Sequence, residues 1–138
     1  MRQVIFRYRR RVRFGETDPF GVLYFASMLN YFKEAADEFI RHRGEDPEKI
    51  YRNQEKGFGF PVVRVDADYI RPVRYDEELE IEVEVESVRR RAVTLRFNVT
   101  REGTFVATGT MSFVSISSSS WKSIPLPEEI RRIFAPPE

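Results

Sequence analysis

The sequence predicts an α+β fold in which a curved antiparallel sheet wraps around one long central helix. Three patterns predict it: an N-terminal segment of alternating polarity, one long apolar segment with helical spacing, and four further strands in succession. Consecutive strands with short turns form an antiparallel meander. The long helix is the one large apolar element that can cover the inner face of this sheet. No repeat or linker divides the chain, so we expect a single domain over residues 1–138.

The first expected strand lies within residues 4–14. Arginines occupy one parity of this segment, and the other parity is mostly apolar, at Phe6, Tyr8, Val12 and Phe14. A period of two indicates a strand with one buried and one solvated face. Arg10 is the exception, because it interrupts the apolar parity.

A long helix is expected over residues 22–42. Apolar residues from Phe25 to Ile40 recur with i, i+3, i+4, i+7 spacing. The first half is apolar nearly all round, which is typical of a helix enclosed by other elements. Gly44 ends the helix, and basic residues, including His42, suit its negative end.

The remaining elements follow in order. Residues 45–61 predict a short helix at Pro47–Lys56, because proline suits a first turn, and then a loop at Gly57–Pro61. Strands are expected at residues 62–73, 79–88, 92–100 and 105–116, with a last short helix from Pro127. In the second of these strands, glutamates alternate with apolar residues, which predicts a solvated face opposite Arg96 on the next strand.

Composition excludes several classes of function. The 138 residues include 23 Lys+Arg, 22 Asp+Glu, one histidine and no cysteine. Cysteine nucleophiles, serine triads and metal sites with two histidines are therefore not expected, and no glycine-rich phosphate loop is present. The near-neutral charge argues against nucleic acid as a partner, so the arginines at 7–13 are interpreted as a solvated face or a subunit contact. Without a signal peptide or a membrane-spanning run, we expect a cytoplasmic protein.

Asp18 is the strongest candidate for chemistry. It lies in the turn Thr17–Gly21, where an aspartate often only caps the turn or the following helix. Aromatic residues flank this turn, however, and the long apolar helix begins directly after it. Such surroundings can desolvate a base, and the free N–H groups of a helix start can stabilise an oxyanion. From the residues alone, both interpretations remain open.

The segment from Arg13 to Ser27, RFGETDPFGVLYFAS, followed by NYFKEA at 30–35, resembles the signature of the 4-hydroxybenzoyl-CoA thioesterase family. Within that family it is most similar to the small acyl-CoA thioesterases associated with the Tol–Pal system. The resemblance implies the hotdog fold, a CoA thioester as substrate without a further cofactor, and a homo-oligomer, either a dimer or a dimer of dimers. It also implies that Asp18 is the nucleophile or general base and that the backbone N–H near Phe25 polarises the thioester carbonyl.

Further residues have expected roles in substrate binding. The resemblance places Arg89, Arg90 and Arg91 toward the CoA phosphates, although a solvated hairpin turn explains them equally well. Candidates for the acyl pocket are aromatic: Phe14, Phe20, Tyr24, Phe25, Phe58 and Phe60. Glu34 is the reserve carboxylate. The alternative function is a non-catalytic acyl-ligand binding protein in which Asp18 is only a cap, and the sequence leaves the acyl group open.

Overall fold

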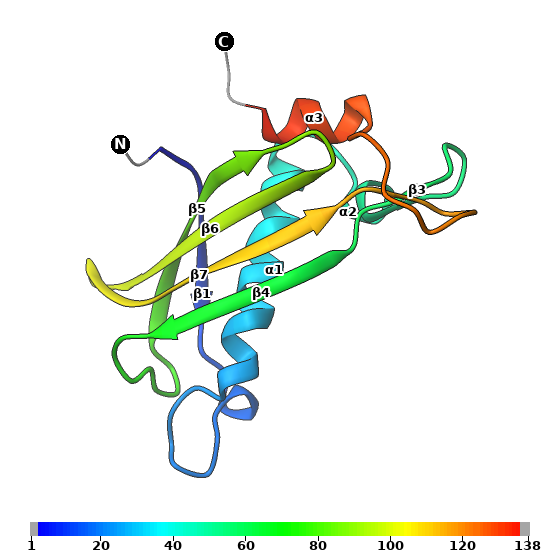
Figure 1. Ribbon diagram of the computed structural model, residues 1–138. Coiled ribbons are helices and arrows are strands. Elements are labelled where there is room, and N and C mark those ends of the chain that lie inside the picture. Colours follow the sequence, from blue (N-terminus) through cyan, green and yellow to red (C-terminus); the bar gives the residue numbers. More distant parts are fainter. Residues whose placement is uncertain (1–2, 136–138) are drawn as a thin grey trace.

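The computed structural model describes residues 3–135 as a curved sheet with one long helix against its inner face (Figure 1). The main sheet is antiparallel, with the strand order β1 (Val4–Arg11), β5 (Glu78–Val88), β6 (Ala92–Arg101), β7 (Thr104–Val114) and β4 (Val62–Tyr69). Helix α1 (Phe25–His42) contacts β1, β5 and β4. The predicted α+β hotdog architecture is confirmed.

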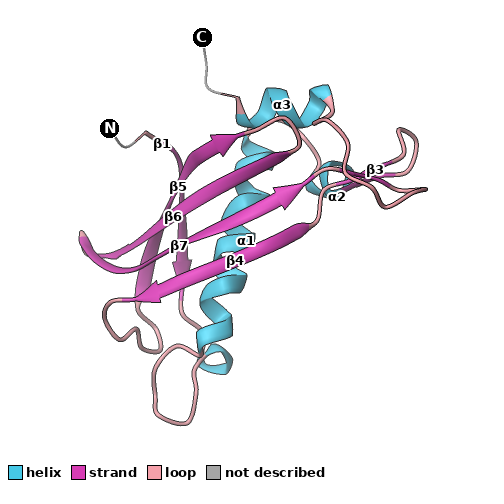
Figure 2. Ribbon diagram, in the orientation of Figure 1, coloured by secondary structure: helices cyan, strands magenta, loops and turns pink. Residues whose placement is uncertain are grey.

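The smaller elements differ in part from the prediction. Helix α2 (Pro47–Tyr51) is shorter than expected, because β2 (Arg52–Asn53) pairs with β3 (Phe58–Gly59) inside the predicted helix and loop. Strand β8 (Ile116–Ser117) completes a small second sheet, which projects beside the main one (Figure 2). A one-turn helix η1 (Phe14–Glu16) follows β1, and α3 (Glu128–Phe134) lies over the end of α1, where Phe134 contacts Phe39.

The middle of α1 packs tightly against the sheet. The ring of Phe32 stacks on that of Phe97 of β6, with 4.7 Å between centroids and 6° between planes. Gly109 of β7 makes this approach possible. A Cβ atom at Gly109 would lie 2.2 Å from the carbonyl oxygen of Asp66 and 2.5 Å from the Phe32 ring. The helix can therefore pack this closely only where the sheet has no side chain.

The outer face of the sheet is a ladder of ion pairs. Arg11 pairs with Glu78 at 3.0 Å, and Arg7 lies 3.4 Å from Glu80 across the β1–β5 register. Arg96 of β6 contacts Glu86 at 2.8 Å. The glutamate face predicted for β5 is present, with Arg96 beside it, but it is solvated only in part, because Glu82 and Glu84 are buried. The exposed arginines of β1, Arg7, Arg9 and Arg11, pair with carboxylates, which agrees with their interpretation as a solvated face; Arg10, in contrast, is buried.

Within residues 3–135, no helix combines the length and hydrophobicity that a membrane crossing requires. In the same part of the chain, His, Asp and Glu side chains form no group of three that could hold a metal ion.

Candidate active site

The loop between η1 and α1 folds back on itself as a tight hairpin. Thr17 and Leu23 form an antiparallel bridge, and the Leu23 N–H donates to the carbonyl of Val73 at 2.6 Å. At the tip, the Gly21 N–H donates to the Asp18 carbonyl at 2.9 Å, and Gly21 has a φ of +96°. A φ in this range favours glycine. The predicted turn is therefore confirmed.

Asp18 uses only one carboxylate oxygen inside this turn. Its Oδ1 accepts hydrogen bonds from the N–H groups of Phe20 at 3.0 Å and Val22 at 3.3 Å. Its Oδ2 has no partner among the described residues. The side chain is half-buried. Asp18 caps its own turn and keeps one oxygen available to a ligand.

Helix α1 begins at Phe25, three residues later than predicted. Tyr24 is the N-cap in an extended conformation (φ −64°, ψ 137°), and no side chain caps the helix. The Tyr24 N–H donates to the Glu16 carbonyl at 2.9 Å, and the Ser27 N–H donates to the Tyr24 carbonyl at 2.9 Å. The N–H groups of Phe25 and Ala26 have no acceptor within residues 3–135. Two free donors therefore lie at the positive end of an 18-residue helix.

Asp18 and the helix start border one cavity of about 520 Å³. Four aromatic residues line it together with apolar side chains and one arginine: Phe20, Tyr24, Phe25 and Tyr69, with Leu23, Met28, Ile70, Val73 and Arg71. Such a mostly apolar cavity with a few polar groups is typical of a small-molecule site. Phe20 is 88% exposed and Phe25 60% exposed, so much of this aromatic wall faces out of the chain.

The far wall of the cavity comes from the end of β4, which the sequence analysis did not identify as part of the site. The Tyr69 hydroxyl donates to the carbonyl of Phe25, and an Arg71 guanidinium N–H donates to the carbonyl of Phe105. An aromatic residue and an arginine just before Pro72 were the available signal. Their contact with the helix start depends on the sheet topology, which the local sequence does not encode.

Several other predicted site residues lie elsewhere. Phe58 and Phe60 are buried in the core, where Phe60 stacks on Phe113 at 5.0 Å, and neither lines the Asp18 cavity. Phe14 packs edge-on against Tyr75 at 5.7 Å and lines a different cavity. These corrections follow from the small β3 strand and from η1, which the sequence analysis did not anticipate.

The three arginines of the β5–β6 turn, Arg89, Arg90 and Arg91, are exposed and far from Asp18 within one chain. The Asp18 hairpin is bonded to Val73, just before β5, whereas the turn follows the end of β5. Eleven strand residues, at about 3.3 Å each, separate the two ends by about 35 Å. In Figure 1 the loop before α1 and the β5–β6 turn lie at opposite ends of β5.

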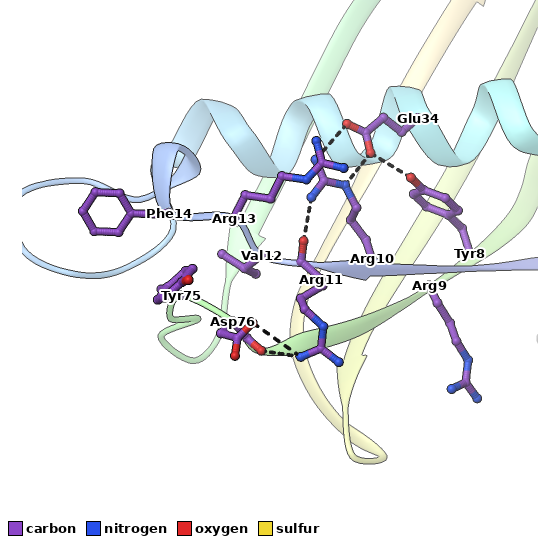
Figure 3. Close-up of a pocket in the computed structure, with 10 residues that line it drawn as sticks. All are labelled: Tyr8, Arg9, Arg10, Arg11, Val12, Arg13, Phe14, Glu34, Tyr75 and Asp76. Carbon is purple, nitrogen blue, oxygen red and sulfur yellow. Dashed lines mark hydrogen bonds and ion pairs between the residues drawn. The ribbon is translucent and has the colours of Figure 1, made fainter.

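Glu34, the reserve carboxylate, also lies outside this cavity. It accepts hydrogen bonds from Arg10 Nε at 2.8 Å and from the Tyr8 hydroxyl at 2.9 Å (Figure 3). Arg10, which interrupts the apolar parity of the first strand, points inward and is only 9% exposed. Burial alone would lower the pKa of Arg10, but Glu34 and Glu16 raise it above its ordinary value, so the guanidinium stays charged.

In this hotdog fold, the Asp18 carboxylate and the start of α1 border one cavity. A model of the Thioesterase-like superfamily matches residues 12–134, and the chain belongs to that superfamily.

Relatives and solved structures agree with this membership. A 1,4-dihydroxy-2-naphthoyl-CoA hydrolase from Nostoc punctiforme is 30% identical over 125 residues, covering 91% of this chain and 83% of the relative. A hydrolase of the same name from Prochlorococcus marinus is 28% identical over 127 residues, covering 88% and 82%. The crystal structure of a hypothetical protein from Aquifex aeolicus superposes with a TM-score of 0.85 at 28% identity, covering 94% and 98%. The predicted enzyme class, a thioester hydrolase, is confirmed.

Proposed function

We propose that this protein hydrolyses an acyl-CoA thioester to a free acid and CoA, with Asp18 as nucleophile or general base. One observation carries the proposal: Asp18 Oδ2 is unpartnered among the described residues, on the wall of a cavity that the free end of α1 also borders. A base and an oxyanion site are the two elements that thioester hydrolysis requires.

Two routes fit this arrangement. As a nucleophile, Asp18 attacks the thioester carbon, the C–S bond breaks with release of CoA thiolate, and water then hydrolyses the mixed anhydride. As a general base, Asp18 accepts a proton from a water that attacks the same carbon, and the proton passes to the leaving sulfur. In both routes the N–H groups of Phe25 and Ala26 are the donors for the oxygen that gains negative charge.

An aromatic acyl group suits the cavity best. Its walls carry Phe20, Tyr24, Phe25 and Tyr69, which can stack on an aryl ring. The Nostoc and Prochlorococcus relatives carry the name of an aryl-CoA hydrolase. The finer resemblance, to 4-hydroxybenzoyl-CoA thioesterases and the Tol–Pal subgroup, also includes an aryl-CoA substrate. We therefore place this substrate in the class of hydroxyaryl-CoA thioesters.

Assembly into a homo-oligomer, such as a dimer of dimers, is part of the proposal. Strand β4 is an edge of the sheet, and its apolar residues Val62, Val63 and Tyr69 are exposed. An exposed apolar edge strand favours pairing with another chain. Because Arg89, Arg90 and Arg91 are remote from Asp18 in one chain, they can bind CoA at this site only from a second copy.

Release of free thiol from a panel of CoA thioesters tests the function. The panel contains 4-hydroxybenzoyl-CoA, 1,4-dihydroxy-2-naphthoyl-CoA and linear acyl-CoAs, and we expect faster turnover of the aryl esters. Asp18→Asn keeps the oxygen that accepts the turn hydrogen bonds but cannot act as a base. We therefore expect an intact fold and a kcat lowered by about 10²-fold or more.

Binding of these thioesters without thiol release would instead support the non-catalytic acyl-ligand protein. Near-normal turnover by Asp18→Asn would remove Asp18 from the mechanism while leaving the enzyme class intact.

A further inference from the structure

A buried arginine connects β1, the Asp18 loop and α1. Arg10 lies between β1 and α1, and Figure 3 shows its guanidinium reaching the carboxylate of Glu34 on the helix. The opposite side of the same guanidinium forms a bidentate pair with Glu16, in which Nη1 lies 2.9 Å from Oε1 and Nη2 contacts Oε2. A bidentate pair fixes both the distance and the orientation of its partners.

The carboxylate of Glu16 is further restrained by two neighbouring groups. Its Oε1 accepts the Tyr31 hydroxyl at 2.7 Å and the Arg13 N–H at 2.8 Å. Burial alone would raise the pKa of Glu16, but the hydrogen bonds from Arg10, Tyr31 and the Arg13 N–H lower it below the ordinary value. Glu16 is therefore ionised at neutral pH, and its carboxylate is fixed by hydrogen bonds from Arg10, Tyr31 and the Arg13 N–H.

The main chain of the same residue holds the start of α1. The Glu16 carbonyl accepts the Tyr24 N–H at 2.9 Å and the Ser27 hydroxyl at 3.0 Å. These two residues bracket Phe25 and Ala26, whose N–H groups are free. Asp18 follows Glu16 by two residues, and its N–H donates to the Val22 carbonyl at 2.8 Å. The Glu16 main chain therefore links the loop that carries Asp18 to the two residues on either side of the free amides.

We infer that Glu16, held by Arg10, is a positioning residue that sets the place of the Asp18 carboxylate relative to the Phe25 N–H. This inference rests on the proposed function. Glu16 does not line the Asp18 cavity, so it acts through the loop and the helix start. Small displacements of reacting groups lower rates strongly, which is why a restraint at this point matters for turnover.

The test compares Glu16→Gln with Asp37→Asn as a matched control. Asp37, in the second half of α1, is also a half-buried carboxylate. Its Oδ1 accepts the Tyr51 hydroxyl at 2.6 Å and a hydrogen bond from Lys33 at 2.9 Å. Its hydrogen bonds do not reach the Asp18 loop. We expect Glu16→Gln to lower kcat on an aryl-CoA about tenfold or more with KM changed less than threefold. Asp37→Asn should change kcat less than twofold.

A double-mutant cycle separates positioning from general destabilisation. In the Asp18→Asn background there is no carboxylate left to position, so Glu16→Gln should cost threefold or less. The same tenfold loss in both backgrounds would overturn the inference. Arg10→Lys is the second variant, because lysine retains the charge without the bidentate geometry; it should reproduce the kcat loss of Glu16→Gln.

Amide hydrogen exchange gives a readout that needs no activity. In Glu16→Gln, protection of the N–H groups of Asp18 and Tyr24 should fall at least tenfold, and in Asp37→Asn it should stay unchanged. Unchanged protection in Glu16→Gln would overturn the inference even if the enzyme hydrolyses aryl-CoA. If the wild-type protein cleaves none of the thioesters and Glu16→Gln still loses protection, the proposed function is wrong, whereas the role of Glu16 in positioning the loop is supported.

Discussion

Replacing Phe25 by proline removes one backbone N–H from the start of α1 and leaves the helix in place. Phe25 is the first helical residue, a position that tolerates proline because its N–H has no intrahelical acceptor. The residue before a proline must be extended, and Tyr24 already is, with φ −64° and ψ 137°. The Phe25 carbonyl, which accepts the Tyr69 hydroxyl, is retained. We therefore expect the free energy of unfolding to change by about 1 kcal/mol at most.

The expected loss of turnover follows from the number of free donors. The Tyr24 and Ser27 N–H groups are already bonded to carbonyls, so Phe25 and Ala26 supply the available donors at the helix start. Removing one preorganised oxyanion donor costs about 10²–10³-fold in kcat. With the Ala26 N–H remaining, we expect Phe25→Pro to lie near the lower end, at about 10²-fold.

Phe25→Ala is the matched control, because it removes the ring and keeps the N–H. Initial rates of thiol release on an aryl-CoA, measured for both variants beside urea unfolding curves, separate the two contributions. Loss of the ring should raise KM, since the ring lines the cavity, and loss of the N–H should lower kcat. If Phe25→Pro keeps a kcat within threefold of Phe25→Ala, the amide is not an oxyanion donor.

Three further predictions concern packing, pH and CoA. Gly109→Ala should destabilise the protein by about 3 kcal/mol, because its Cβ would overlap a backbone oxygen and the Phe32 ring, and an unchanged urea midpoint would contradict this. The pKa of the Glu16 carboxyl is lower in the folded protein than its ordinary value of 4.5, so ionised Glu16 stabilises the fold at pH values above 4.5. This stabilisation is lost as the pH falls through the folded pKa. Urea midpoints between pH 7 and 3 should therefore fall less steeply in Glu16→Gln, whereas parallel curves would refute the linkage. Replacing Arg89 and Arg91 with alanine should raise KM more than it lowers kcat, and less so at high salt; the same KM at low salt would show that these arginines form only a solvated turn.

The main elements were predictable because their patterns are local. The alternation in β5 and the helical spacing after Phe25 each lie within one segment, and each predicts its element directly. The prediction of where α1 starts was less accurate. Val22 and Leu23 continue the apolar pattern, yet they lie outside the helix, because the Leu23 N–H bonds to Val73, which is 50 residues away. A long-range hydrogen bond of this kind is not visible in periodicity.

The loop half of the candidate site was also predictable, and the β4 half was not. The Asp-Pro-Phe-Gly turn identifies Asp18 from four adjacent residues, and the turn has the expected geometry. Tyr69 and Arg71 reach the same cavity from the end of β4, the edge strand farthest from β1 in the sheet. Their place depends on α1 crossing beneath the whole sheet, which strand patterns alone do not specify.

Arg10 shows how one irregular residue can indicate a site before its partners are known. A charged side chain on the apolar parity of a strand must either end the strand or find partners in the core, because an unpaired buried charge is strongly destabilising. The strand continues to Arg11, so the second outcome applies. The partners are Glu16, from η1 beside the Asp18 loop, and Glu34, from α1, and no local pattern could pair them with Arg10. Two well-packed apolar residues could serve stability equally well. The charged cluster at the junction of loop, helix and strand is better explained by the geometry that it imposes on the residues beside it.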